Sequence, residues 1–554
     1  MGDASIGEFT FILRGFKSRV GDVVAIPMDV PNDDYSGINE VVAWGRITTI
    51  NRYNPFFPYE AAQELASEEI PLVDTVLSKS RDQLQATVLV LGFTYRNLDG
   101  SMDLYPLTYP IPPAADVKYP SAAAIGKLLA GGLVNQTPLN IGTLIARSDV
   151  KVDISADRVV ARHIAIMAMT GGGKTVAARR IIRELIEVGY PLVILDPHGD
   201  YLGLWEKRKL FPKSSVKLFY PRIVMTADNR AIVETLVAKM TQGLTEPQKD
   251  LMSWILTTIN PRVGQPVQDY IRTLVTVAGN IAGGRQQAGT QTSAATANAV
   301  RRSLELVLDR LTVMEISNTR LRATLKEYQF DALTDPEGSP ESVVRPGQVS
   351  ILYLGGYDHL TQSTIVSILL EALFKHRAEL ANRIPPFFTV VEEAHNFVPS
   401  TVEGTEETPS LVTLRKIITE GRKFGAGLLL ITQRPSRVEQ TILAQCNSFL
   451  VMRLVNPKDQ SYVQQVMENL PASDAKLLPG FGPGQGIIGG QAVRFPLLVK
   501  IKFDQDLVGS RTGDENFIKQ ARDWKPDASA GSRARAAAAA QTLARRTARP
   551  RRRG

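Results

Sequence analysis

Short hydrophobic runs alternate with amphipathic, helix-like segments along most of the chain beyond about residue 151. The run HIAIMAM (163–169) is followed by KTVAARRIIRELIEVG (174–189), in which apolar residues recur every three or four positions, and then by YPLVILD (190–196). The alternation returns at QVSILYLGG (348–356), PFFTVVEEA (386–394) and LLLITQR (428–434). Near-continuous apolar strands between helices are typical of a parallel sheet with both faces covered. The pattern predicts an α/β core over residues 151–505.

The segments around this core have different sequence patterns. Residues 1–150 contain β-branched runs such as VGDVVAIPMDV and LQATVLVLGFTY, separated by Gly, Pro, Asn and Asp, and these predict a small β-barrel domain. Residues 230–343 replace the strand–helix alternation with a mostly helical insertion in the core. Residues 506–554 are expected to form a basic tail that is partly disordered.

Composition and charge narrow the class of protein. At 554 residues the chain exceeds one hydrophobic core, so two or three domains are expected. The one cysteine, Cys446, excludes an intrachain disulfide framework and a zinc site built from cysteines. Apolar runs fall short of the roughly 20 residues that a membrane helix needs, so we expect a cytoplasmic protein without a membrane span. The eight arginines of residues 531–554 equal the net charge of +8, so the rest of the chain is formally neutral. This tail either contacts nucleic acid or an acidic partner, or serves solubility alone.

The segment MAMTGGGKT (167–175) is similar to the phosphate-binding pattern G-x-x-x-x-G-K-[ST]. Consecutive glycines let successive amides point at phosphate oxygens, Lys174 would reach the β- and γ-phosphates, and the Thr175 hydroxyl would bind Mg²⁺. The first glycine of the pattern is replaced by Ala168, which is tolerated if its φ angle is negative. The candidate ATP-binding residues are Thr170, Gly171, Gly172, Gly173, Lys174, Thr175 and Val176.

Two carboxylates follow the apolar strand FFTVV at the point where such a nucleotide site needs acids. Glu392 is expected to hold the Mg²⁺ shell through water, and Glu393 to orient or deprotonate the attacking water. The alternative is a surface pair that caps a helix. His395, two residues on, is expected to be structural.

Other strand ends supply further candidates. Asp196 in LDPHGDY would join the metal shell or hold Lys174, or would form an ordinary Asp-Pro turn. Gln433, after LLLIT, is placed to sense the γ-phosphate. Phosphoryl transfer also needs a cation at the developing charge, often from a neighbouring subunit. Arg422 in EGRKFGAG is our candidate for that cation, with Arg415 and Arg453 as rivals.

Five blocks carry a resemblance to a known family. They are RHIAIMAMTGGGKT, LDPHGDY, VVEEAHNFVP, EGRKFGAGLLLITQRPS and NSFLVMRLVNPKDQ. In order and spacing, across about residues 140–500, they resemble the HerA family, which consists of prokaryotic, mainly archaeal, hexameric ATPases of the FtsK–HerA group. The N-terminal β domain is similar to the HAS barrel of that family.

The resemblance implies a RecA-like P-loop NTPase core in a homo-hexamer that moves double-stranded DNA through its channel, with the ATP–Mg²⁺ site between subunits. It implies a NurA-type nuclease partner on the barrel side, with other end-resection proteins, acting at the nucleoid in recombinational repair. By position, Glu393 would activate water, Gln433 would sense phosphate, Arg422 would act in trans, and Arg162 would add a phosphate contact. The rival functions are a conjugation-type or other DNA-pumping ATPase of the same superfamily and a nucleotide-gated scaffold for DNA ends.

Overall fold

The computed structural model describes residues 4–13, 18–32, 36–53, 83–95, 102–226, 228–289, 292–378, 383–400, 407–467, 470–509 and 517–523. The chain divides into two compact units, Met1–Leu507 and Val508–Gly554. The described helix of the second unit is α16 (Phe517–Asp523), so most of the predicted tail, including every arginine of residues 531–554, lies outside the described residues. Within the described residues, none of the helices is long and apolar enough to cross a membrane.

The N-terminal region is a four-stranded antiparallel sheet in the order β1-β4-β3-β2. Its strands are β1 (Glu8–Leu13), β2 (Val23–Pro31), β3 (Ile38–Tyr53) and β4 (Gln83–Tyr95). The pairing of β3 with β4 shifts register between Trp44 and Gly45 and again between Ile47 and Thr49. Such irregularities bend a strand and increase its twist, so the long β3 can curve around the separate core formed by residues such as Phe9 and Ile26.

The rest of the first unit is built on a twelve-stranded sheet in the order β10-β9-β11-β8-β12-β13-β7-β14-β15-β16-β5-β6. The strands from β10 to β14 in this order are parallel, and the remaining four join antiparallel. The parallel strands are β7 (Ile164–Met167), β8 (Leu192–Asp196), β9 (Ser215–Pro221), β10 (Phe330–Leu333), β11 (Gln348–Tyr353), β12 (Phe387–Val391), β13 (Ala426–Thr432) and β14 (Ser448–Met452). The others are β15 (Gln485–Gly490), β16 (Leu497–Ile501), β5 (Pro138–Leu144) and β6 (Lys151–Ser155).

Helices cover both faces of this sheet. In β7, Ile164 and Ile166 belong to one hydrophobic core, whereas Ala165 and Met167 belong to another. Because successive strand residues point to opposite faces, the two cores lie on opposite sides of the sheet. The core of Ile164 also takes residues from α3 (Ala122–Ala130), α4 (Ala156–Arg162), α5 (Lys174–Glu187) and α6 (Leu202–Glu206). The core of Ala165 takes residues from α11 (His359–Ala378), α12 (Pro409–Phe424), α13 (Gln440–Ala444) and α14 (Pro457–Val466). The predicted α/β core is therefore confirmed.

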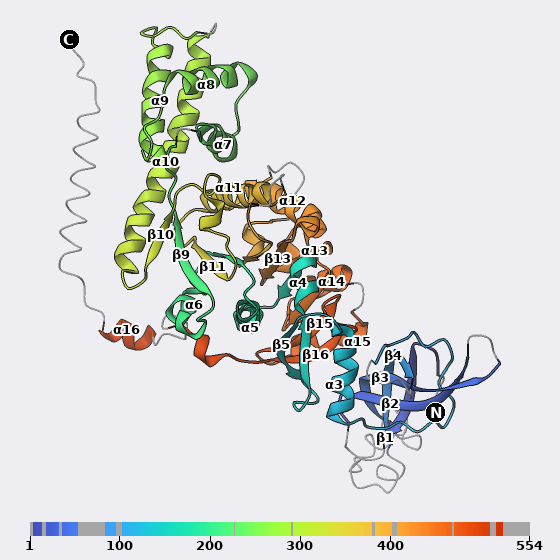
Figure 1. The fold of residues 1–554 in the computed structure, drawn as a ribbon. Coiled ribbons are helices and arrows are strands. Elements are labelled where there is room, and N and C mark those ends of the chain that lie inside the picture. Colours follow the sequence, from blue (N-terminus) through green and yellow to red (C-terminus); the bar gives the residue numbers. More distant parts are fainter. Residues whose placement is uncertain are drawn as a thin grey trace, which may run out of the picture. The chain divides into compact units, whose positions relative to one another are not determined.

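The predicted helical insertion contains α7 (Ala231–Met240), α8 (Glu246–Thr258), α9 (Val267–Ala282) and the long α10 (Ala294–Thr324). Helices α9 and α10 pack side by side (Figure 1). The insertion is not helical to its expected end at residue 343, because β10 pairs with β9 and returns the chain to the large sheet.

The start of the α/β core is not marked by a break at residue 150. Strand β5 already pairs with β16 and β6, so the twelve-stranded sheet begins at Pro138. The two sheets are also tied by a buried ion pair, in which Arg46 of β3 donates to both carboxylate oxygens of Asp474 in α15 (Ala472–Ala475). The N-terminal sheet and the core therefore share one compact unit.

Candidate active site

The glycine-rich loop lies at the carboxyl end of β7 and leads directly into α5. Gly171 and Gly173 have positive φ angles of 76° and 103°. A Cβ atom on Gly173 would lie 2.8 Å from the backbone nitrogen of Gly484. The first helical hydrogen bond of α5 is donated by the Ala177 amide to the Gly173 carbonyl at 2.9 Å. The amides before Ala177 therefore lie at the N-terminus of α5, where backbone N–H groups can bind a phosphate.

Ala168 fits the place of the missing glycine. Its amide continues the sheet by donating to the Thr432 carbonyl at 3.2 Å, and its side chain is fully buried. Among the described residues, the non-glycine positions with positive φ are Ala114, Asn135, His163 and Glu393. The backbone at Ala168 therefore makes no demand for glycine.

Several other strands bring polar side chains to the same edge of the sheet. Strands β12 and β13 are parallel to β7 and lie on one side of it, so the residues after their carboxyl ends meet the loop. Lys174 Nζ lies 2.8 Å from Glu393 Oε1 and 3.7 Å from Glu392 Oε1. The Thr170 hydroxyl donates to Gln433 Oε1 at 2.6 Å. The structure thus brings together Thr170, Lys174, Glu393 and Gln433.

Glu393 has an unusual backbone. Its φ and ψ angles are both 50°, in the left-handed region that non-glycine residues rarely adopt. Its Oε1 lies beside Lys174, and its buried Oε2 has no hydrogen-bond partner. Oε2 lies 3.3 Å from His395 Nδ1, which in turn is 3.3 Å from the Thr432 hydroxyl. Backbone strain and an unsatisfied buried oxygen are typical of a functional position.

Glu392 is buried behind Glu393 and has a different environment. The Tyr201 hydroxyl donates to its Oε2 at 2.5 Å. Burial raises the pKa of Glu392 to about 7, against the opposing effect of Lys174. Glu392 does not line the loop cavity, so its contact with the Mg²⁺ shell stays a prediction. Tyr201 was not singled out from the sequence, although it lies only five residues after Asp196.

The Asp196 carboxylate is occupied by its own turn. Its Oδ1 accepts from the amides of His198, Gly199 and Asp200, and its Oδ2 accepts from the Tyr201 amide. The side chain is fully buried, and burial raises its pKa to about 6. These contacts favour the Asp-Pro turn over the metal ligand, because its oxygens are already used by backbone donors.

The candidate arginines lie at different edges of the sheet. Arg162 is at the end of α4, before β7, and Arg422 is exposed in the last turn of α12, before β13. Both therefore lie at the amino ends of adjacent strands, opposite the loop of their own chain. Arg453 follows β14 and its carbonyl accepts from the Met169 amide at 2.9 Å, so it lies beside the loop. Arg415 forms an ion pair with Glu407 at 2.9 Å.

A cavity of about 620 Å³ opens on the loop, a size usual for small-molecule sites. It is lined by every predicted loop residue from Thr170 to Val176 except Gly172, and by Glu393 and Gln433. Sequence reasoning missed the lining residues Asp200, Pro483, Gly484, Lys500, Ile501 and Phe503. Asp200 belongs to the LDPHGDY block, but nothing in the sequence places the others near residue 174.

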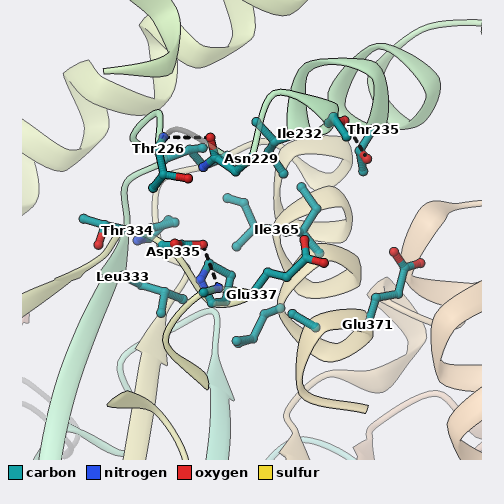
Figure 2. A pocket seen from close by; sticks show the side chains of 18 of the residues that line it. Thr226, Asn229, Ile232, Thr235, Leu333, Thr334, Asp335, Glu337, Ile365 and Glu371 are labelled. Atoms are coloured by element: carbon teal, nitrogen blue, oxygen red, sulfur yellow. Dashed lines mark hydrogen bonds between the residues drawn. The ribbon is translucent and has the colours of Figure 1, made fainter. Parts of the chain in front are cut away.

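A second cavity of about 580 Å³ lies between α7, α11 and the segment after β10. Figure 2 shows Ile232, Ile365 and Leu333 around it, with Asp335 and Glu371 among its polar groups. It shares no lining residue with the loop cavity, so it is separate from the candidate active site.

The residues around the loop fit ATP with Mg²⁺. Lys174 and the α5 amides offer positive charge, and the Thr175 hydroxyl is a group that can bind a metal ion. Among the described residues there is no group of three or more His, Cys, Asp or Glu side chains able to hold a metal. Mg²⁺ is commonly bound by one or two protein ligands together with substrate phosphates and water.

The sequence is also similar to known helicases. Residues 139–373 match the family described as Helicase HerA, central domain; the match includes the loop, whereas Glu393 and Gln433 lie beyond it. The chain is 27% identical to the DNA double-strand break repair helicase HerA of Pyrococcus furiosus over 77% of this chain and 79% of the relative. It is 26% identical to the protein of the same name from Sulfolobus acidocaldarius over 95% and 96%.

Among solved structures, VirB4 of Thermoanaerobacter pseudethanolicus aligns with a TM-score of 0.44 and 16% identity, covering 67% of this chain and 98% of that one. The plasmid coupling protein TrwB in complex with ADP and Mg²⁺ aligns with a TM-score of 0.44 and 14% identity, covering 68% and 93%. Residues 139–373 thus match the central domain of the HerA family, and the chain is similar to HerA helicases over most of its length.

Proposed function

We propose that this protein is an ATP-dependent double-stranded DNA translocase and helicase, which works as a homo-hexamer with ATP bound between subunits. The observation that carries the proposal is the Lys174–Glu393 pair at the glycine-rich loop, in a chain similar to HerA helicases over most of its length. A loop, a catalytic acid and a sensor at one sheet edge are the parts that phosphoryl transfer requires.

The contacts suggest a role for each residue. Lys174 leaves Glu393 when it binds the β- and γ-phosphates, which frees the Glu393 carboxylate to orient or accept a proton from the attacking water. Gln433, held beside the loop by Thr170, responds to the presence of the γ-phosphate. Because Glu393 is tied to Lys174 until phosphates compete for that lysine, the catalytic acid is engaged only when nucleotide is bound.

The metal would be held mainly by Thr175. Mg²⁺, when bound, neutralises charge on the transferred phosphoryl group. Glu392 would contribute to the metal shell only through water, because its side chain is 1% exposed and its carboxylate accepts from the Tyr201 hydroxyl. Asp196 is the weakest candidate ligand, since its oxygens accept four backbone amides.

The arginines support a site shared between subunits. Strand β13 separates Arg422 from Gln433, and its seven residues span roughly 23 Å at about 3.3 Å per residue. Arg162 is separated from the loop in the same way by β7. This separation argues against contact with the nucleotide of the same chain and supports contact with that of a neighbouring subunit in a ring.

The wider assignment follows from the family. We propose that the ring acts in the cytoplasm, at the nucleoid, on DNA ends destined for recombinational repair. A NurA-type nuclease would dock on the side of the N-terminal sheet. Purification of the assembly from its native host, followed by mass measurement, would identify both the ring and the nuclease; a monomer without a nuclease would refute this part.

The motor function is tested by ATP hydrolysis with and without linear double-stranded DNA. We expect DNA to stimulate hydrolysis, and Glu393→Gln to lower kcat by about 10²-fold or more while ATP binding is kept. Lys174→Ala should abolish binding, and Glu420→Gln, on the exposed face of α12, should have no effect. If DNA does not change the rate of ATP hydrolysis, and Glu393→Gln hydrolyses ATP as fast as the wild type, the result would instead support a nucleotide-gated scaffold.

A further inference from the structure

The loop cavity has two chemically different ends. Glu393 and Gln433 follow β12 and β13, on one side of β7, and mark the end where the γ-phosphate is cleaved. Pro483 and Gly484 precede β15, Lys500 and Ile501 end β16, and Phe503 follows it, on the other side of β7. Because a nucleotide extends away from its γ-phosphate, the ribose and base must lie toward this second end.

Phe503 is the aromatic side chain at that end. It lines the cavity, yet its side chain is 57% exposed, unusual for a ring placed beside a well-packed sheet. The other residues lining this end are Pro483, Gly484, Lys500 and Ile501. Lys500 Nζ donates to the Pro483 carbonyl. The end is therefore largely apolar, with an open ring face suited to a flat, aromatic group.

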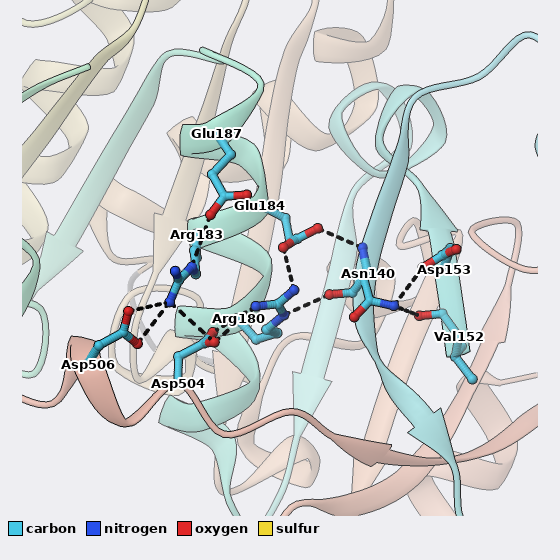
Figure 3. A network of polar contacts seen from close by, with 9 residues as sticks. All are labelled: Asn140, Val152, Asp153, Arg180, Arg183, Glu184, Glu187, Asp504 and Asp506. Carbon is cyan, nitrogen blue, oxygen red and sulfur yellow. Dashed lines mark hydrogen bonds and ion pairs between the residues drawn. The ribbon is translucent and has the colours of Figure 1, made fainter. Parts of the chain in front are cut away.

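The segment that carries Phe503 is fixed on both sides. The Lys502 amide donates to the Ile141 carbonyl at 3.0 Å. Arg180 Nη1 donates to both oxygens of the buried Asp504 carboxylate, at 3.0 and 3.1 Å. Figure 3 shows Asp504 and Asp506 facing Arg180 and Arg183 of α5.

The same helix thus serves both ends of the site. Its first turn carries Lys174 and Thr175, and its middle turns hold the segment after β16. Arg180 is 4% exposed and is also oriented by the Asn140 carbonyl, which its Nε contacts at 2.7 Å. A base platform attached to the phosphate-binding helix keeps a constant spacing between base and phosphates.

We propose that Phe503 is the platform on which the nucleobase of ATP stacks. This inference rests on the proposed ATPase function and adds a base-binding residue to it. Base–aromatic stacking contributes about 1–3 kcal/mol per base. Its loss should weaken nucleotide binding while leaving the groups at the phosphate end in place.

The test uses the full chain, with inorganic tripolyphosphate as a ligand that has phosphates but no base. Phe503→Ala should raise the KM for ATP roughly tenfold, with kcat and the inhibition constant of tripolyphosphate unchanged within about twofold. Phe503→Tyr should keep the wild-type KM. Gln505→Ala, an exposed position of the same segment outside the cavity, is the control and should match the wild type.

An unchanged KM for ATP in Phe503→Ala would overturn the inference. So would a parallel loss of tripolyphosphate binding, because that would indicate general damage to the site. Failure of the wild type to hydrolyse ATP would refute the proposed function itself, and is distinguished from either result.

Discussion

At position 168 the phosphate-binding pattern does not require its usual glycine, because the backbone there does not have a positive φ angle. A glycine is required where φ is positive or where another backbone approaches closely. Gly173 meets both conditions, with a φ of 103° and Gly484 in contact. Ala168 does not have a positive φ, and its buried methyl group packs into the core of the sheet. The departure from the pattern is therefore compatible with a working loop.

Substitutions at these two positions should have opposite consequences. Ala168→Gly should leave ATP affinity unchanged and lower the free energy of unfolding by about 1 kcal/mol, through backbone entropy. Gly173→Ala should weaken ATP binding by on the order of 1–3 kcal/mol, because the new side chain is strained and meets a backbone. Fluorescent-nucleotide titration and thermal melts measure both. Improved ATP binding by Ala168→Gly would contradict this account.

His163 gives the fold a pH dependence. Its Nδ1 accepts from the Leu428 amide at 3.1 Å, and burial lowers its pKa to about 4, from 6.5. Between these values the unfolded chain binds the proton and the folded protein does not, so stability falls as the pH drops from 6.5 toward 4. The loss approaches about 3 kcal/mol at the acid end.

His163→Asn should flatten this dependence, because asparagine tolerates positive φ and does not titrate. The measurement is the melting temperature at pH 7.5, 6 and 5 relative to wild type. His359→Asn, at an exposed position, is the matched control. An unchanged acid slope in His163→Asn would show that other groups cause it.

At the scale of elements, α5 connects parts of the chain that are far apart in sequence. Arg180 pairs with Asp504 and Glu184, and Glu184 accepts from the Asn140 amide of β5 at 2.7 Å. Arg183 adds more exposed pairs with Asp506 and Glu187. The helix after the loop is thereby fixed to the edge of the sheet that carries β16 and β5.

The two arginines should differ in their contribution to stability. Arg180→Ala leaves the Asp504 carboxylate buried without its main partner and should cost about 3–5 kcal/mol. Arg183→Ala removes two more exposed pairs and a longer contact of 3.4 Å to Asp504, and it should cost less, about 1 kcal/mol. Urea unfolding of the two variants, in the same background, compares them. Equal losses would mean that burial of the Arg180 pair has no special importance.

At the scale of the whole molecule, the proposed function implies a site divided between two subunits. The loop, Glu393 and Gln433 lie at the carboxyl edge of the parallel strands, and Arg162 and Arg422 lie at the amino edge. A ring built from head-to-tail contacts brings one half of each subunit against the other half of the next. Hydrolysis should then depend on assembly.

Mixing of inactive subunits tests this dependence. Lys174→Ala should abolish hydrolysis because ATP binding is lost, and Arg422→Ala should lower kcat by about 10³-fold or more. In an equal mixture, roughly a quarter of the interfaces join an intact loop to an intact arginine, so activity should return toward that fraction of wild type. A mixture of Lys174→Ala with Glu393→Gln should stay inactive, since both defects are in the same half. The absence of recovery in the first mixture would place Arg422 outside the site.

The sequence by itself determined the features that depend on local pattern. Strand and helix periodicities predicted the α/β core, the helical insertion and the β-rich start. Spacing after β7 and β12 identified Lys174, Thr175 and the pair Glu392–Glu393, because residues just beyond parallel strands share one edge.

Only the tertiary structure decided the features that depend on backbone conformation and distant pairing. Glu393, whose backbone is left-handed, lines the cavity, whereas Glu392 does not. The buried Asp196 carboxylate accepts four backbone amides and so stabilises its own turn. Antiparallel pairing of β14, β15 and β16 carries Phe503 and Lys500 to a loop more than 300 residues earlier. Local periodicity contains no signal for such long-range contacts, since they arise when the whole sheet assembles.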